Sequence, residues 1–179
     1  IFNDHIGGSN ISRMINLDSS EEKKFSSSIA SVSPDGEWAI GYSFERVNEL
    51  MPGYGYTHKV EEDDLDQYRP KKTGIYKINL SNGNKQELIN IHDLANIKTV
   101  QSMENAKHFF SHAVISPDSA QFMFLHRWKD PNGDIDKRFS RLVIADLSGK
   151  IIDILVTNEM VSHIGWKDSE HIIAYCRVP

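Results

Sequence analysis

Three stretches of the sequence share one residue pattern, and this repeat constrains the fold more than any other feature. They are SIASVSPDGEWAIGYSF from Ser28, SHAVISPDSAQFMFLHR from Ser111 and SHIGWKDSEHIIAYCR from Ser162. Each begins with a serine, continues to a large apolar residue, turns through polar residues that include an aspartate, and ends in an apolar run. Pro34 and Pro117 have no N–H to donate to a ladder, so they mark strand ends. Each stretch therefore predicts two antiparallel strands joined by a tight turn.

A second hairpin follows each of the first two stretches. GIYKINLSNGNKQELINI predicts strands at Ile75–Leu80 and Lys85–Ile91, and RLVIADLSGKIIDILV predicts strands at Leu142–Ala145 and Ile151–Val156. Near the N-terminus, IFND predicts part of a strand, and SRMINLDSSEEKKF predicts one more strand pair. Four antiparallel strands that recur at about 40–50 residues are typical of a β-propeller blade.

The sequence therefore predicts an all-β fold, a partial β-propeller with two full and two partial blades. The expected divisions are 1–27 as the end of one blade, 28–91 as a blade with a long insertion at 46–72, 92–107 as a linker with a short helix capped by Asp93, 108–157 as a second full blade, and 160–179 as the first half of the next. Propellers close with roughly 4–8 blades. We therefore expect a segment of a larger propeller, with open blade edges at which a second copy of the chain can pair.

Composition excludes two classes of partner. The chain is 39% hydrophobic and 25% charged, as expected of a globular protein. Its net charge of -5 leaves no basic surplus for binding nucleic acid. No apolar run reaches the roughly 20 residues of a membrane span, and no signal-peptide pattern occurs in this segment. The one cysteine, Cys176, cannot form an intrachain disulfide and fits either cytosol or periplasm.

Histidines at repeated positions are candidate metal ligands. His112 and His163 both begin the first strand of a blade, the strand that lines a propeller's central channel. His126 ends the following strand, which returns toward His112, so all three are expected at one rim. Imidazole is a common ligand of divalent metals. Strand histidines are also often structural, and the pattern leaves both interpretations open.

Arginine and aromatic residues supply candidate ligand contacts. Arg127 is suited to binding a carboxylate, and Trp128 is suited to stacking on a sugar ring. The alternative is a solvated arginine beside a tryptophan that plugs the blade edge. In the insertion, ERVNELMPGYGYTH offers Tyr54 and Tyr56 as contact surfaces. A loop of this length is either functional or disordered.

These motifs resemble known propellers. The SPDG turns are similar to those of the TolB-like repeat superfamily. The order PGYGY, GIYKINL, FLHRW and RLVIADLSG resembles a group of uncharacterised bacterial WD-type propellers linked to polysaccharide genes. The second half also resembles oligogalacturonate lyase, a family that holds manganese with histidines and cleaves pectin oligomers by β-elimination. That resemblance implies His112, His126 and His163 as ligands, although Arg127 stands where the family has an acidic residue.

Two functions are expected alternatives. In the first, a metal-dependent, lyase-like enzyme acts on uronic-acid glycans, and Arg127 or Arg46 neutralises the substrate carboxylate. In the second, a non-catalytic propeller binds a glycan or a partner protein, with Tyr54 and Tyr56 in the contact surface. Propellers host many unrelated functions, so the fold does not choose between them.

Overall fold

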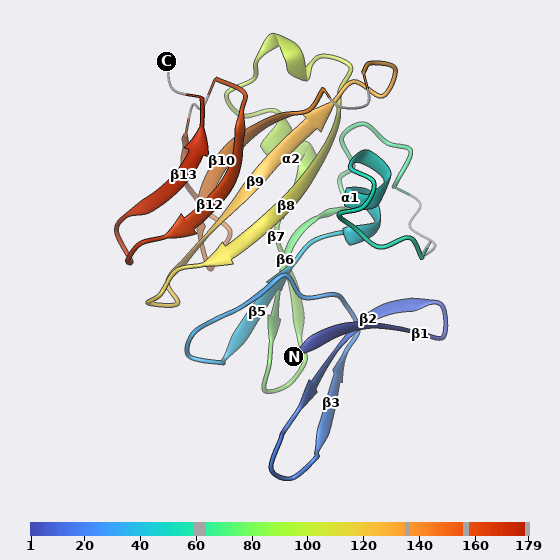
Figure 1. Cartoon of the computed structure of the whole chain (residues 1–179), viewed down its shortest axis with the longest axis vertical. Coiled ribbons are helices and arrows are strands. Elements are labelled where there is room, and N and C mark those ends of the chain that lie inside the picture. Colours follow the sequence, from blue (N-terminus) through green and yellow to red (C-terminus); the bar gives the residue numbers. More distant parts are fainter. Residues whose placement is uncertain (59–63, 135–136, 156–157, 178–179) are drawn as a thin grey trace.

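The chain forms four antiparallel sheets that follow one another in sequence order (Figure 1). The structure, a computed structural model, describes residues 1–58, 64–134, 137–155 and 158–177. Two four-stranded sheets stand in the middle, a three-stranded sheet precedes them and a two-stranded sheet follows them. No helix among these residues is long and apolar enough to cross a membrane.

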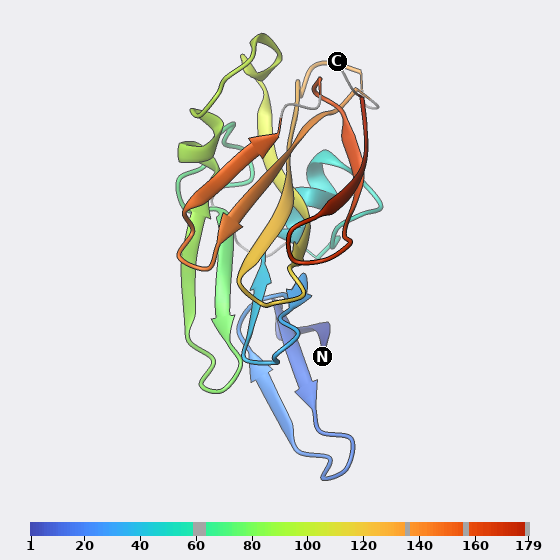
Figure 2. The ribbon, with the colours of Figure 1, turned by 90° about the vertical axis from the view of Figure 1, so that its left-hand side faces the viewer.

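The first sheet contains β1 (Phe2–Ile6), β2 (Ser9–Ile15) and β3 (Glu22–Phe25). The predicted strand pair is β2 and β3, and β1 adds a third strand that is joined to β2 through Gly7 and Gly8. Both glycines have positive φ, which a two-residue hairpin turn of type I′ requires. In Figure 2 the β2–β3 hairpin extends away from the other sheets.

The second and third sheets each have four strands, as the repeat predicts. The second contains β4 (Ser31–Val32), β5 (Trp38–Gly41), β6 (Gly74–Asn79) and β7 (Lys85–Asn90). The third has the order β11-β10-β9-β8 and the strands β8 (Lys107–Ile115), β9 (Gln121–Lys129), β10 (Phe139–Asp146) and β11 (Ile151–Leu155). The fourth pairs β12 (Val161–Trp166) with β13 (Ile172–Cys176). The predicted strand end at Val156 lies outside the described residues.

The two Ser-Pro-Asp turns have the same internal hydrogen bonds. Gly36 N–H donates to the Ser33 carbonyl at 2.9 Å, and Ser119 N–H donates to the Ser116 carbonyl at 3.0 Å. Gly36 and Ser119 have φ of 74° and 61°, so both adopt the left-handed conformation. The repeat in sequence is therefore a repeat in turn geometry.

The insertion between β5 and β6 begins with a helix that the sequence interpretation missed. Helix α1 (Phe44–Leu50) starts where the Ser43 side chain accepts from the Arg46 N–H, a standard N-cap arrangement. Its Val47 and Leu50 are buried against the third sheet's core. The start of the insertion is therefore part of the folded core and not a solvated loop.

The short helix predicted after β7 is present, but its cap differs. Helix α2 (Ile91–Ala95) is capped by Asn90, whose side chain accepts from the Asp93 N–H at 2.8 Å. Asn90 Nδ2 also donates to the Asp93 carboxylate, so Asp93 completes the cap instead of forming it. A 3-10 turn, η1 (Gln101–Met103), follows.

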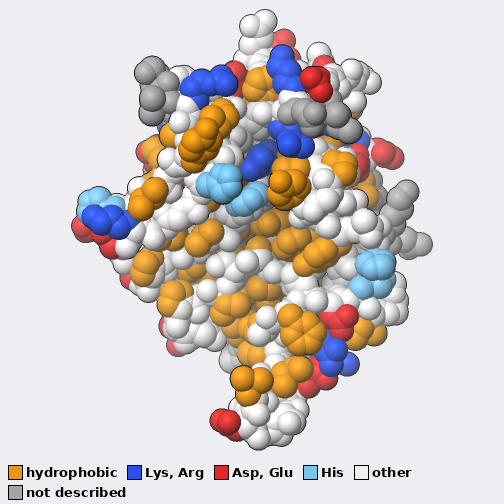
Figure 3. All heavy atoms as spheres, viewed as in Figure 1, with side chains coloured by type: hydrophobic (Ala, Val, Ile, Leu, Met, Phe, Trp, Pro, Cys, Tyr) orange, Lys and Arg blue, Asp and Glu red, His pale blue; other side chains and the backbone are white. Residues whose placement is uncertain are grey.

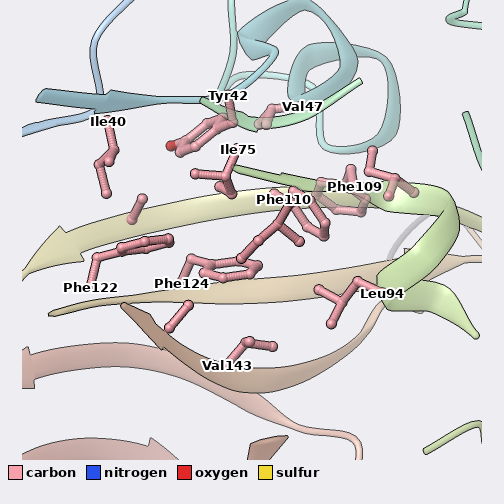
Figure 4. Close-up of a cluster of buried hydrophobic side chains, with 14 of the residues drawn as sticks. Ile40, Tyr42, Val47, Ile75, Leu94, Phe109, Phe110, Phe122, Phe124 and Val143 are labelled. Atoms are coloured by element: carbon pink, nitrogen blue, oxygen red, sulfur yellow. The ribbon is translucent and has the colours of Figure 1, made fainter. Parts of the chain in front are cut away.

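Strand β9 separates two hydrophobic clusters. Phe122 and Phe124 pack with the second sheet, where Figure 4 shows them facing Ile40 and Ile75 across the core. The alternate residues Met123 and Leu125 pack with the fourth sheet. Because successive strand residues point to opposite faces, one strand contributes to both interfaces.

Candidate functional site

A bulge in β8 gives His112 an unusual backbone conformation. Ser111 pairs with Leu125 and Val114 pairs with Met123, so two residues of β8 lie opposite one residue of β9. His112 is one of the two, and its φ of 55° is left-handed. Glycine ordinarily fills this conformation in a bulge, so a histidine here is a strained residue of the kind that clusters at functional sites.

The second repeated Ser-His pair also lies at a register shift, but His163 itself pairs with Tyr175 and lacks the left-handed backbone conformation of His112. The register of β12 shifts between Val161 and His163. Ser162 Oγ and His163 Nδ1 share a hydrogen bond of 2.8 Å, and Ser111 Oγ and His112 Nδ1 share one of 2.9 Å. In both rings the preceding serine engages Nδ1, which leaves Nε2 as the nitrogen available to a ligand.

Arg127 is buried without a carboxylate partner. Its side chain in β9 is 8% exposed, and its Nε has no hydrogen-bond partner. Nη1 makes a long contact of 3.7 Å with the sulfur of Met51. Among the described residues no acidic side chain forms an ion pair with it. Burial lowers the pKa of Arg127 to about 10, so the guanidinium keeps its charge at neutral pH.

Arg127 and His163 both lie close enough to His112 to influence its pKa. We call these three residues the histidine–arginine site. Burial lowers the pKa of His112 to about 4, and the next causes are the charges of Arg127 and His163. His112 is therefore neutral at pH 7. Figure 3 shows histidine and basic side chains gathered on one face with hydrophobic side chains beside them.

The two predicted tyrosines differ in their surroundings. Tyr54 is 65% exposed and lies within electrostatic reach of Arg127. Tyr56 stacks on Phe44 with ring centroids 4.6 Å apart, and its hydroxyl accepts from Asn3 Nδ2 at 2.7 Å. Tyr54 therefore offers an exposed aromatic surface, whereas the ring and hydroxyl of Tyr56 are engaged by Phe44 and Asn3.

The prediction that His126 shares a rim with His112 and His163 is wrong. The His126 side chain is fully buried, and both of its ring nitrogens have partners. Nε2 lies 2.9 Å from His108 Nδ1, and Nδ1 accepts from Arg141 Nε at 3.1 Å. Neither nitrogen is left for a metal.

These contacts also fix the positions of the ring protons. Since Arg141 donates to Nδ1 of His126, the neutral His126 ring carries its proton on Nε2 and donates it to His108. His108 then carries its own proton on Nε2, a buried atom without a partner among the described residues. Burial lowers the pKa of His108 to about 3 and the pKa of His126 well below its usual value.

Two further predicted site residues have structural roles. Arg46 is 1% exposed and donates to backbone carbonyls, among them those of His108 at 2.6 Å and Gln67 at 2.7 Å. It ties the insertion to β8, and its burial closes it off from solvent. Trp128 is 1% exposed, donates from Nε1 to Ser102 Oγ at 2.9 Å and packs with Met103 and Ala106, so it is not open to a ligand. The alternative interpretation places a solvated loop arginine beside it, whereas Arg127 is buried within β9.

The residues present do not complete a manganese site. Without His126, two imidazoles remain, and no group of three or more His, Cys, Asp or Glu is placed to hold a metal among the described residues. Manganese favours several oxygen ligands. The positive charge of Arg127 also opposes a cation next to His112.

Tyr42 and Arg138 are site residues that the sequence interpretation missed. The hydroxyl of Tyr42 accepts from the His112 N–H at 3.2 Å. Arg138 contributes to lowering the pKa of Arg127, and Tyr42 acts in the opposite direction. Tyr42 directly follows the apolar strand of the first repeat, a position that is compatible with many roles. Nothing in the sequence around Arg138 distinguishes it from other surface arginines.

Two cavities lie away from His112 and Arg127. One of about 240 Å³ is lined by residues of β6, β7 and the insertion, among them Asp64 and Lys85. Another is lined by Gln101, Asp130 and Lys137. Neither is lined by His112 or Arg127.

The sheets and the site together define a β-propeller segment with a basic, aromatic-flanked surface site where its third and fourth blades meet. Among solved structures the chain is similar to an acylaminoacyl peptidase in complex with Z-Gly-Gly-Phe-chloromethyl ketone, with a TM-score of 0.57 and 14% identity. The match covers 93% of this chain and 23% of the peptidase chain, a protein that has a β-propeller domain. This likeness confirms the fold alone. No family model and no curated protein matches the chain.

Proposed function

We propose that this segment belongs to a carbohydrate-related β-propeller protein and that the histidine–arginine site binds an acidic glycan, such as one built from uronic acids. Arg127 carries the proposal. A buried cation without a counter-charge costs free energy, and Arg127 has no carboxylate partner among the described residues. A carboxylate of the ligand would supply a counter-charge, and guanidinium groups bind carboxylates favourably.

The neighbouring groups suit a sugar. The exposed ring of Tyr54 provides an apolar face of the kind that packs against a pyranose ring. His112 is neutral at pH 7, so its ring can donate to or accept from hydroxyl groups. The cation of Arg127, the aromatic face of Tyr54 and the neutral imidazole of His112 together favour a ligand that carries both a carboxylate and hydroxyl groups.

Calorimetric titration with an oligogalacturonate tests this function, and the methyl ester of the same oligomer is the matched neutral ligand. We expect the acid to bind and the ester to bind more weakly. In Arg127→Gln the affinity for the acid should fall by about tenfold or more, because a hydrogen bond to a charged group contributes about 1.5–3 kcal/mol.

Arg13→Gln is the control variant. Arg13 forms exposed ion pairs with Asp4 and Glu22 on the first sheet and should leave the affinity unchanged. Equal binding of acid and ester, or an Arg127→Gln variant that binds like the unaltered protein, would contradict the proposal.

A metal-dependent, lyase-like β-elimination on uronic-acid glycans is the second candidate function. The observation that favours it is the pair His112 and His163, each with Nδ1 engaged by the preceding serine and Nε2 available. The incomplete donor set described above weighs against it.

Elemental analysis and a product assay distinguish the two candidates. A lyase requires one bound divalent metal per chain, its loss in the variant with His112 and His163 both changed to alanine, and an unsaturated sugar product that absorbs ultraviolet light. Binding of the acidic oligomer without either signal supports the non-catalytic function.

A further inference from the structure

The backbone of His112 is held by a hydroxyl from the neighbouring blade. The His112 N–H donates to the Tyr42 hydroxyl at 3.2 Å, a contact between residues 70 positions apart. Tyr42 directly follows β5 and is 8% exposed, and burial raises the pKa of its hydroxyl. The bulge removes the His112 amide from the β8–β9 ladder, so this hydroxyl satisfies a donor that would otherwise lack a partner.

Tyr42 is itself the end of an aromatic stack. Its ring lies on Phe44 at 4.6 Å between centroids, and Phe44 lies on Tyr56 at the same distance. The stack joins the end of β5 to the insertion. Its three rings fix the direction in which the Tyr42 hydroxyl points.

The far end of the stack is anchored to the first sheet. Asn3, in β1, donates from Nδ2 to the Tyr56 hydroxyl at 2.7 Å. The same side chain donates to the Ile29 carbonyl at 2.8 Å and accepts from the Ile29 N–H at 2.7 Å. A continuous series of contacts therefore runs from the first sheet through the insertion to His112 in the third.

We propose that Tyr42 is a positioning residue that holds His112 in its left-handed conformation and so directs the imidazole into the histidine–arginine site. The stack of Tyr42, Phe44 and Tyr56 sets the place of the hydroxyl. Without that hydroxyl the His112 backbone relaxes toward the extended conformation that a non-glycine residue prefers, and the ring leaves Arg127. This inference rests on the proposed function, because it concerns the ligand affinity of the same site.

Tyr42→Phe is the direct test, because it removes one oxygen and keeps the ring in the stack. Ser33→Ala is the control: it also removes one hydroxyl oxygen from the second sheet, where Ser33 donates to the Trp38 carbonyl at 2.8 Å, and Ser33 does not contact the aromatic stack. The first measurement is amide hydrogen exchange at His112, by NMR on the ligand-free protein. The second is the affinity for the acidic oligomer.

We expect Tyr42→Phe to speed exchange at His112 by about fivefold and to weaken binding by a similar factor, as the loss of one hydrogen bond of about 1 kcal/mol implies. Ser33→Ala should change neither by more than about twofold. Unchanged exchange at His112 in Tyr42→Phe would overturn the inference, as would faster exchange with unchanged affinity.

A second variant keeps the test decisive if Tyr42→Phe folds poorly. Tyr56→Phe loses only the Asn3 bond at the far end of the stack, and it should speed exchange at His112 by less than Tyr42→Phe does. No change at His112 in this variant would also count against the inference. If the unaltered protein does not bind the acidic oligomer, the proposed function fails, and exchange at His112 still decides whether Tyr42 holds the bulge.

Discussion

His126 and Arg127 are adjacent in β9, yet their side chains serve opposite faces of the third sheet. His126 joins a buried network with His108 and Arg141. Arg127 lies opposite Ser140, whose hydroxyl donates to a backbone carbonyl at the start of β12. The two neighbours therefore have different roles because they lie on different faces of the sheet: His126 is structural, and Arg127 is the candidate ligand-binding residue.

Substitution by methionine should change the stability of the fold differently at two buried arginines, Arg127 and Arg46. Arg127→Met removes a charge without a carboxylate partner and fills the space with apolar atoms, so the free energy of unfolding should fall by less than about 1 kcal/mol or rise. Arg46→Met should lower it by about 3 kcal/mol, because several buried carbonyls lose their donor. Urea unfolding of both variants checks the contrast, and equal losses would contradict it.

Substitutions of His112 separate backbone strain from ligand binding. His112→Gly should be about 1 kcal/mol more stable than His112→Ala, because glycine adopts a φ of 55° without a steric cost. Both variants lack the imidazole and should bind the acidic oligomer equally weakly. Thermal unfolding and calorimetric titration measure the two effects. An alanine variant at least as stable as the glycine variant would show that the bulge carries no strain.

Acidification should destabilise the fold through its buried histidines. Burial lowers the pKa of His108 to about 3 and that of His126 well below 6.5, so the folded chain keeps both neutral. The unfolded chain takes up these protons as the pH falls below about 6.5. Stability is therefore complete above that pH and declines toward pH 3, by up to about 1.4 kcal/mol per pH unit for each histidine.

Urea titrations at about pH 7 and about pH 5 measure this dependence. The double variant with His108 and His126 both changed to glutamine should show a flatter profile. His171→Gln is the control, because this exposed ring pairs with Asp168 at the surface. A free energy of unfolding that does not change between the two pH values would contradict the prediction.

The open edge of the fourth sheet should promote self-association. Among the described residues β13 pairs only with β12, and its Ile173 and Tyr175 are 66% and 67% exposed. An unpaired apolar edge is a template for another strand. Sedimentation at increasing concentration should show dimers, and Ile173→Lys should reduce them. A strictly monomeric chain would contradict the prediction.

Strands and turns could be predicted from the sequence because they depend on local chemistry. Pro34, Pro117 and the Asp-Gly and Asn-Gly pairs mark strand ends wherever they occur. Whether the side chains of His112 and His126 lie on the same side of the sheet could not be predicted, because His112 lies in a bulge. One extra residue in a strand reverses every side chain beyond it, and the β8 bulge is not marked by a glycine.

The roles of Arg46 and Arg127 were equally hidden in the sequence. Arg46 donates to backbone carbonyls. Every residue type has a carbonyl, so no pattern of residue types in the sequence identifies the partners of Arg46. The burial of Arg127 depends on α1, which places Met51 beside it. A signal for that helix does exist: Ser43 is a favoured N-cap residue, and Val47 and Leu50 follow at helical spacing.

The two Ser-His pairs lie at corresponding places in successive sheets, so the angle between them depends in part on the rotation that carries one sheet onto the next. In a complete ring this rotation equals a full turn divided by the number of blades. A ring with more blades would bring the rings of His112 and His163 closer to parallel, and one with fewer would make them converge more steeply. For the proposed ligand site, the blade count of the assembled propeller would therefore influence recognition, even through blades that do not touch the ligand.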